Sequence, residues 1–294
     1  MQNTLKLVAA AAALAAASLA HADVSIGANI EHDITKAKGA DMASSGRVEV
    51  GLGAKATMGD SFVAGRLAVE AGTAGGASPA IADAWVQFGT SSVDLKLGRF
   101  EGIGLDAKGK DTYIVGRAAG YHGTTGAVRG RVATGQVHAA LGINAAPGLR
   151  FELGMVSAQT GQANGFRPVV SYTSGPLSIS AGIEMLKNTA TGSQTGFGTV
   201  LGYDLGGGTS IGATLAKNND TDASTYGAFA NIGALGVGYV HDDNGANVTS
   251  NAFYAAYTLP LLDVKGASLT PAISFGKNNG VSDSGVRLRF NYTF

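Results

Sequence analysis

The sequence contains no cysteine, few charged residues and no excess of charge of either sign. Without cysteine there is no disulfide framework, no thiolate metal site and no lipid-anchored cysteine, so the fold must hold by hydrogen bonding and packing. Charged residues make up 14% of the chain, and 21 basic residues balance 21 acidic ones. Because nucleic-acid binding calls for a net basic face, this balance argues against such a partner.

Long apolar runs are also missing, except near the N-terminus. Leu7–Ala20 is an almost wholly apolar run of fourteen residues, and Ala20-His21-Ala22 matches the small-x-small cleavage site of a secretory signal peptide. Fourteen residues fall short of the roughly 20 that a membrane-spanning helix needs. We therefore expect residues 1–22 to be a cleaved signal peptide and 23–294 to be a single domain, which would cross a membrane only as strands.

Two-residue alternation of apolar and polar side chains recurs along the whole chain. It is clearest at the C-terminus, where Val286, Leu288, Phe290, Tyr292 and Phe294 alternate with Arg287, Arg289, Asn291 and Thr293. This pattern is typical of a strand with one face toward lipid and the other toward water. The 45 glycines show no G-x-y period, which excludes collagen and fits tight turns and crowded barrel walls.

Short turns such as Ser174–Pro176 and Gly206–Gly208 alternate with longer polar connections such as Asn188–Thr195 and Lys277–Ser284. The sequence thus predicts an all-β fold, a transmembrane antiparallel up-and-down β-barrel, because a sheet in hydrocarbon must close to satisfy its backbone. Counting back from Phe294 gives sixteen strands, with fourteen and eighteen as neighbouring counts, and leaves 101–134 as a long third loop. Residues 127–133 also alternate and would change the count if they spanned the membrane.

Three segments resemble the Gram-negative general porins, most closely the beta-proteobacterial kind. They are the terminal strand with Phe290, Tyr292 and Phe294, the hairpin formed by residues 84–89 and 93–100, which ends in Leu97-Gly98-Arg99, and the hairpin at 169–178. The terminal motif looks like the signal read by the outer-membrane assembly machinery. The resemblance implies a cell outer membrane location and a homotrimer of water-filled barrels whose third loop folds inward.

By the same resemblance, Glu101, Asp106 and Asp111 would place carboxylates on the constriction loop, facing basic residues of the wall. The loop itself departs from the family, because the usual proline-glutamate-phenylalanine-glycine-glycine stretch is absent and only Phe100-Glu101-Gly102 is similar to it. It also carries Lys108, Lys110 and Arg117, so its path and its electric field are open.

The period of two assigns the polar side chains to the lumen. The basic residues predicted to line the pore are Arg47, Lys55, Arg66, Lys96, Arg150, Arg167, Arg287 and Arg289, and the acidic ones are Glu49, Glu70, Asp83, Asp94, Glu152 and Glu184. Arg99 shares parity with Leu95 and Leu97, so a bulge or a strand end would be needed to turn it inward. The slight basic excess predicts weak anion preference, against the simpler interpretation that these are ordinary wetted lumen residues.

Other motifs carry little weight. The segment Gly104–Asp111 nearly matches a phosphate-binding loop, but Asp111 replaces the hydroxyl that would hold magnesium, and no helical pattern follows. The histidines lack metal-ligand spacing, and His138, which is predicted to point inward, has no identifiable catalytic partner, so no cofactor is expected. We interpret the chain as a passive porin for small hydrophilic solutes and ions. The alternatives are a channel selective for organic acids or sugars, a non-conducting structural barrel and an outer-membrane hydrolase.

Overall fold

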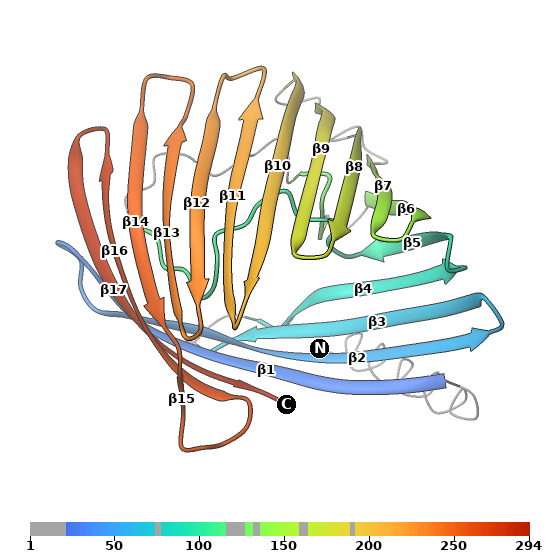
Figure 1. The fold of residues 1–294 in the computed structure, drawn as a ribbon, viewed down its shortest axis with the longest axis horizontal. Helices are drawn as coiled ribbons and strands as arrows, with labels where there is room; N and C mark the ends of the chain where they lie inside the picture. Colours follow the sequence, from blue (N-terminus) through green and yellow to red (C-terminus); the bar gives the residue numbers. More distant parts are fainter. Residues whose placement is uncertain (1–21, 74–77, 116–126, 132–135, 159–163, 189–191) are drawn as a thin grey trace.

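The protein is a closed antiparallel β-barrel, shown in Figure 1 with its strands labelled. This computed structural model describes residues 22–73, 78–115, 127–131, 136–158, 164–188 and 192–294. Each strand pairs with its sequence neighbours, and the barrel closes where β1 pairs with β17, from Asn29 opposite Thr293 to Ala37 opposite Gly285. The chain ends beside the first strand, because Ala28 and Phe294 exchange two backbone hydrogen bonds of 3.0 and 3.1 Å.

The strands of the described residues are β1 (Ala22–Ala37), β2 (Ala43–Met58), β3 (Ser61–Gly72), β4 (Ala80–Gly89), β5 (Val93–Arg99), β6 (Gln136–Ala146), β7 (Leu149–Ala158), β8 (Asn164–Ser174), β9 (Leu177–Asn188), β10 (Gly192–Gly206), β11 (Thr209–Asn218), β12 (Ser224–Ile232), β13 (Leu235–Asp243), β14 (Thr249–Tyr257), β15 (Leu259–Pro260), β16 (Ala267–Asn278) and β17 (Val281–Thr293).

The short element β15 continues β14, so the barrel has sixteen strands. Both pair with β16 in one register, with Ala256 opposite Ala272 and Leu259 opposite Leu269. Between them the ladder is interrupted opposite Pro271, which has no N–H to donate. The predicted antiparallel barrel of sixteen strands is confirmed.

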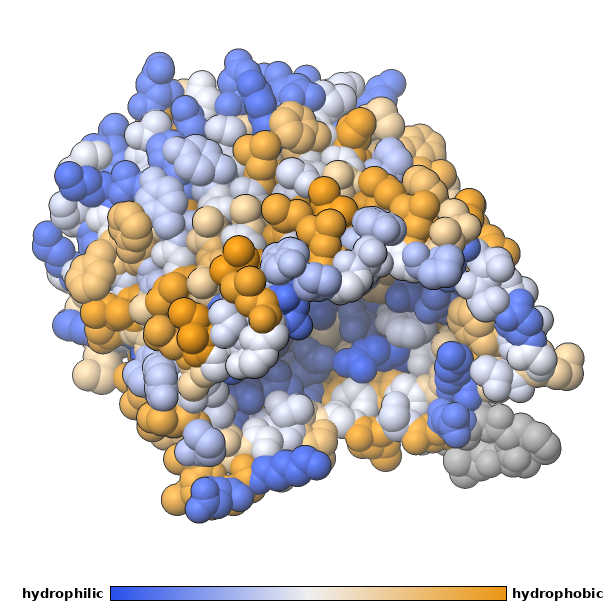
Figure 2. Space-filling model, in the orientation of Figure 1, coloured by the Kyte–Doolittle hydropathy of each residue, from blue (hydrophilic) through white to orange (hydrophobic). Residues whose placement is uncertain are grey.

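Side chains alternate between the two faces of the wall as the sequence predicts. Large apolar residues such as Ile26, Val63, Val137, Phe166 and Phe275 are exposed on the outer face. Figure 2 shows hydrophilic residues in the hollow of the barrel and hydrophobic ones on its outside. A cation on the outer face costs roughly 2–4 kcal/mol at the bilayer midplane and about 0–1 kcal/mol near the interfaces. The outward lysines Lys187, Lys217 and Lys277 accordingly lie at strand ends.

Connections at the two ends of the barrel differ in length. The end that holds Phe294, the turn end, has mostly two-residue turns, such as Gly207-Gly208 between β10 and β11. The other end, the loop end, holds Asn244–Val248 and the third loop. Because outer-membrane barrels have short periplasmic turns and longer external loops, the turn end faces the periplasm.

Two of the longer connections expected from the sequence are wrong. Lys277–Ser284 forms most of a tight hairpin, since β16 runs to Asn278 and β17 begins at Val281, and residues 192–195 of the expected connection 188–195 pair with β9. Both segments are polar because they extend past the apolar band while still hydrogen-bonded as strands. The signal-peptide prediction concerns residues 1–22, of which 1–21 lie outside the described residues. The described residues contain no helix that is long and apolar enough to span a membrane.

Candidate functional site: the lumen and its third loop

The third loop lies inside the barrel, against the inner wall. Ile103 N–H donates to Glu152 of β7 at 2.7 Å, and Lys110 N–H donates to Asn231 of β12 at 3.0 Å. Val115 N–H donates to Ser274 of β16 at 3.2 Å. Between these points Tyr254 of β14 donates its hydroxyl to the carbonyl of Lys108 at 2.8 Å. The described part of the loop therefore runs along the inner face of the wall from β7 to β16, and it narrows the lumen on that side.

Residues 127–131, the part of the third loop that leads back toward β6, are held by a buried ion pair. Glu184 of β9 and Arg167 of β8 form an ion pair of 3.5 Å, and their side chains are 0% and 1% exposed. The Glu184 carboxylate also accepts the N–H groups of Ala127 and Val128 at 3.0 and 3.1 Å. Val128 is itself buried, so residues 127–131 form part of the barrel interior. In the described residues they do not span the membrane, and the alternative strand at 127–133 is wrong for that part.

Residues 111–113 of the loop are held by β17 and by Thr258, which lies between β14 and β15. Arg287 donates to the carbonyl oxygens of Asp111 and Thr112 at 2.8 and 3.2 Å. The Asp111 carboxylate accepts the Thr258 hydroxyl at 2.9 Å, and Thr258 in turn accepts from Thr270 at 3.2 Å. Arg287 also lies over the Tyr113 ring, 5.8 Å from its centroid. Burial raises the pKa of the Tyr113 hydroxyl above its usual range.

Glycines in the wall leave room for the loop to lie flat. A Cβ on Gly236 would lie 2.9 Å from the carbonyl oxygen of Lys110, and one on Gly276 would lie 2.8 Å from that of Val115. Both distances are shorter than a normal van der Waals contact. The loop backbone therefore approaches the wall more closely than any other residue would allow.

Charged side chains of alternating sign cross the part of the wall formed by β17 and β1–β4. In order, this charge ladder consists of Asp33, Arg289, Glu31, Arg47, Glu49, Arg66 and Asp83 of the wall, followed by Arg131 of the third loop. Its contacts range from 2.7 Å for Arg289–Asp33 to 3.8 Å for Arg47–Glu49. Glu70 adds a second carboxylate to Arg47 at 3.0 Å. In the strand order the ladder lies across the lumen from β9–β12, which hold Glu184 and Asn231, two of the anchors of the loop.

A second polar group lies nearer the turn end. Arg150 of β7 and Asp94 of β5 form an ion pair of 2.7 Å. Lys96 lies over Trp85, with 4.3 Å from its nitrogen to the ring centroid, and Lys55 lies over Phe62 at 5.2 Å. The parity of these cations along their strands is that of the inner face of the wall.

Arg99 turns toward the loop at the end of β5. Gly98 before it has a φ of 118°, where a side chain would collide with the Ala84 carbonyl oxygen. Arg99 donates to the carbonyl oxygens of Ile81 and Ala82, at 2.9 and 3.2 Å, and to that of Arg131. The strand end therefore carries the irregularity that an inward Arg99 requires.

The loop carboxylates have partners close to them. Glu101 pairs with Arg129 at 3.1 Å and Asp106 with Lys108 at 3.3 Å, both within the loop. Among the described contacts of these three carboxylates, the one with the wall is that of Asp111 with Thr258. The expectation that all three carboxylates face basic wall residues is therefore not what the structure shows for Glu101 and Asp106, because loop cations lie nearer to them.

Glu31 and Asp33 are lumen carboxylates that the sequence analysis missed. Each pairs with Arg289, and Glu31 also pairs with Arg47. Their parity, opposite to that of Ile26, Ala28 and Ile30, was the available signal. With these two included, the eight basic wall residues predicted to face the lumen meet eight acidic ones.

His138 stacks on Phe100 with ring centroids 4.0 Å apart and is buried. It therefore packs beneath the start of the third loop. Among the described residues, no group of three histidine, aspartate or glutamate side chains is placed to hold a metal ion.

A closed barrel of sixteen strands with a polar interior, an apolar outside (Figure 2) and an internal loop has the architecture of a membrane channel. The chain belongs to the Gram-negative porin family, whose model matches residues 9–294. It is an outer-membrane porin, and its family and fold point to a channel rather than an enzyme.

Solved structures share the fold at low sequence identity. A variant of the Rh. blastica porin superposes with a TM-score of 0.66 at 13% identity, over 92% of this chain and 100% of that one. OmpT of Vibrio cholerae, an outer membrane protein described in its trimer form, gives a TM-score of 0.68 at 15% identity, over 93% and 100%. No curated protein matches the sequence.

Proposed function

We propose that the channel passes small hydrophilic solutes and ions by passive diffusion and filters them at the gap between the third loop and the charge ladder. The observation that carries this proposal is the placement of the ladder on β17 and β1–β4, across the lumen from the loop anchors at Glu184 and Asn231. Opposed charges along a passage with low-dielectric walls create a transverse field, which orients dipolar solutes and selects ions. No catalysis, cofactor or energy input is part of this function.

The ladder favours a weak preference for anions. Its arginines extend further into water than its carboxylates: the Arg66 and Arg47 side chains are 39% and 35% exposed, whereas those of Glu49 and Glu31 are 15% exposed. Solutes would therefore meet guanidinium groups before carboxylates. Because the lumen charges nearly balance in number, the preference is small.

Single-channel recording in planar bilayers tests the proposal. Stepwise conductance with a small anion-selective reversal potential in a salt gradient is expected. A barrel without conductance would support the structural alternative and overturn the proposal, and a clear cation preference would overturn the selectivity. Saturable block by one organic acid or sugar, without block by unrelated solutes, would favour a substrate-selective channel.

The protein is further proposed to assemble as a homotrimer, to lose residues 1–22 as a signal peptide and to be inserted into the outer-membrane lipid by the assembly machinery through its terminal strand. The trimer form of OmpT supports the first point. Native electrophoresis with and without heating tests it, since a single band at the monomer position in both lanes would contradict a trimer.

A further inference from the structure

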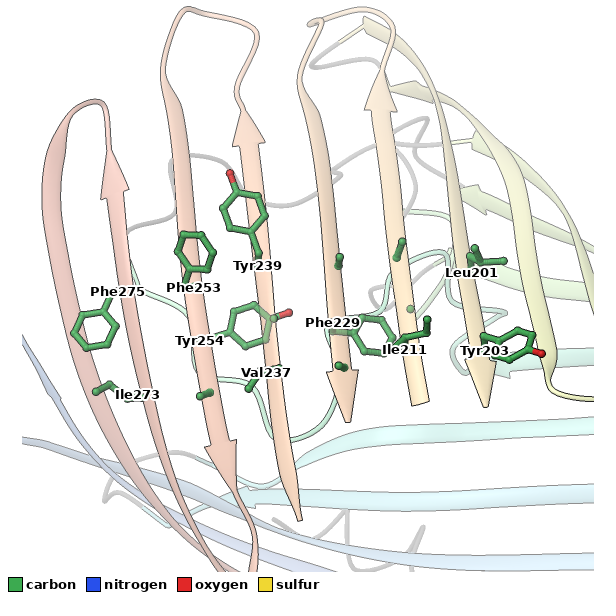
Figure 3. Close-up of a pocket in the computed structure, with 16 residues that line it drawn as sticks. Leu201, Tyr203, Ile211, Phe229, Val237, Tyr239, Phe253, Tyr254, Ile273 and Phe275 are labelled. Atoms are coloured by element: carbon green, nitrogen blue, oxygen red, sulfur yellow. The ribbon is translucent and has the colours of Figure 1, made fainter. Parts of the chain in front are cut away.

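Two aromatic side chains of the wall differ from the rest in the face they occupy. Most large rings of the described residues are exposed on the outer face, and Figure 3 shows examples on β10, β14 and β16, namely Tyr203, Phe253 and Phe275. Phe62 of β3 and Trp85 of β4 instead have the parity of the inner face, as Arg66 opposite Trp85 does. Both rings are half-buried. They therefore offer aromatic surface to a solute in the lumen.

Each of these two rings lies beneath a lysine ammonium. Lys96 of β5 lies over Trp85, with 4.3 Å from Nζ to the ring centroid, and Lys55 of β2 lies over Phe62 at 5.2 Å. A ring has no net charge, so it holds a cation in place without neutralising it. Among the ion pairs formed within the described residues, none involves either lysine. Both ammonium groups therefore retain hydrogen-bond donors for an anion.

The sheet register brings the two lysines into one row across four strands, which we call the lysine row. Lys55 pairs with Ala64, Ala64 with Gln87, and Gln87 with Lys96. The lysines incline toward each other, since one lies over a ring of β3 and the other over a ring of β4. The row lies one pair of residues, about 7 Å, toward the turn end from Arg66 of the charge ladder. A solute that enters from the loop end and passes Arg66 meets the lysine row next.

The carboxylates near Lys96 already have other partners. Asp94, two residues away on the same face, accepts hydrogen bonds from Arg150 at 2.7 and 3.1 Å and from Gln87 at 2.8 Å. Glu152 of β7 accepts a loop N–H at 2.7 Å. Because neither carboxylate forms an ion pair with Lys96, its positive charge is available beside the aromatic surface.

We propose that the lysine row and its two rings bind aryl carboxylates, which are solutes with a planar aromatic ring and a carboxylate. The carboxylate would accept hydrogen bonds from Lys96 Nζ, and the solute ring would pack edge-on or offset against Trp85. Lys55 with Phe62 repeats this combination on the neighbouring strand. The inference rests on the proposed function, since a solute reaches the site only through an open channel. Aliphatic carboxylates gain from the lysines but not from the rings.

Single-channel recording with benzoate and with cyclohexanecarboxylate tests the site. At neutral pH both solutes carry one carboxylate on a six-membered ring, but only the benzoate ring is aromatic. The concentration of benzoate that halves the open-channel current should be roughly two- to tenfold lower than that of cyclohexanecarboxylate, because an aromatic pair contributes a factor of this size. Benzyl alcohol, which lacks the carboxylate, should not block the channel in this range.

Variants assign the block to the proposed residues. Phe62→Leu combined with Trp85→Leu should abolish the difference between the two acids, whereas Trp85→Phe should retain it. Lys96→Gln should weaken the block by both acids. Phe253→Leu removes an exposed ring from the outer face and should change neither. Stepwise conductance in salt alone confirms that each variant forms a barrel.

Equal block by the two acids in a conducting wild-type channel would overturn the aryl-carboxylate site and leave the proposed diffusion of solutes intact. A double leucine variant that still distinguishes the acids, or a Lys96→Gln variant blocked as the wild type is, would also overturn it. A wild-type protein without any conductance would instead refute the proposed function, and this site with it.

Discussion

Arg287 of β17 donates a hydrogen bond of 2.8 Å to the carbonyl oxygen of Asp111, which precedes it by 176 residues. The guanidinium is buried and also donates to Thr112. Hydrogen bonds to a charged group contribute about 1.5–3 kcal/mol each. Arg287→Gln should therefore release the far end of the third loop into the lumen, lowering the mean single-channel conductance and increasing the current noise in the open state.

Thr258→Val tests the same anchor without a change in charge, because it removes the hydroxyl that Asp111 accepts. It should raise the noise in the same direction, by less. Lys55→Gln removes a lumen cation far from the anchor and should leave the noise unchanged. Steady currents equal to wild type in both anchor variants would show that the loop is held by other contacts.

Gly236→Val should displace the loop by adding a side chain to the wall, instead of removing one of the loop's anchors. Its Cβ would fall 2.9 Å from the Lys110 carbonyl oxygen, so the loop must move away from the wall and into the passage. Conductance should fall, and Gly276→Val, opposite Val115, should have a similar effect. Gly65→Ala, whose Cβ would make only an ordinary contact with the Trp85 carbonyl oxygen at 3.4 Å, is the control. An unchanged conductance in both valine variants would contradict the close packing of loop and wall.

The sequence allowed the strands to be predicted but not the path of the loop. Alternation identified outward residues such as Phe253 and Phe275 because the bilayer imposes the same apolar requirement on every strand. No comparable periodicity exists in residues 101–115, whose contacts are made with partners as distant as Ser274 and Arg287. Parity placed Glu184 in the lumen, but its role in binding the Val128 N–H depends on the folded loop.

Removing a positive or a negative charge from the charge ladder should shift the reversal potential in opposite directions. Arg66→Gln removes an exposed guanidinium between Glu49 and Asp83, so the reversal potential in a salt gradient should move toward cation preference. Glu49→Gln should move it toward anions by a similar amount, since each variant changes one charge at the same place. Lys265→Gln lies outside the lumen and serves as the control. Shifts of the same sign would show that the ladder does not set the selectivity.

Substitution of Glu184 should lower the free energy of unfolding more than substitution of any other lumen carboxylate. Replacement by leucine leaves Arg167 buried without its carboxylate and leaves two loop N–H groups without their acceptor. Breaking a buried pair in this way costs about 3–5 kcal/mol. The free energy of unfolding, measured in urea with the protein in lipid vesicles, should fall by that amount.

The double variant Arg167→Met with Glu184→Leu removes both charges and should recover part of the loss, because no uncompensated ion remains. Glu184→Gln keeps one acceptor and should lie between the wild type and leucine. A leucine variant as stable as wild type would mean that water or another group solvates Arg167.

A substitution at Phe294 should impair assembly in the cell while leaving the stability of the folded barrel unchanged. The Phe294 backbone hydrogen-bonds with Ala28, whereas its ring is 63% exposed and contacts Tyr292 at 5.6 Å between centroids. Phe294→Ala retains the backbone bonds and loses little buried area, so the variant refolded in detergent should unfold at nearly the same urea concentration as wild type. If the ring is read by the assembly machinery, the amount of folded protein in the outer membrane should nevertheless fall several-fold.

Leu262→Ala, which truncates another exposed apolar side chain at the turn end, controls for loss of surface area and should assemble normally. Equal membrane levels of the Phe294→Ala and wild-type proteins would remove the terminal ring from the assembly signal.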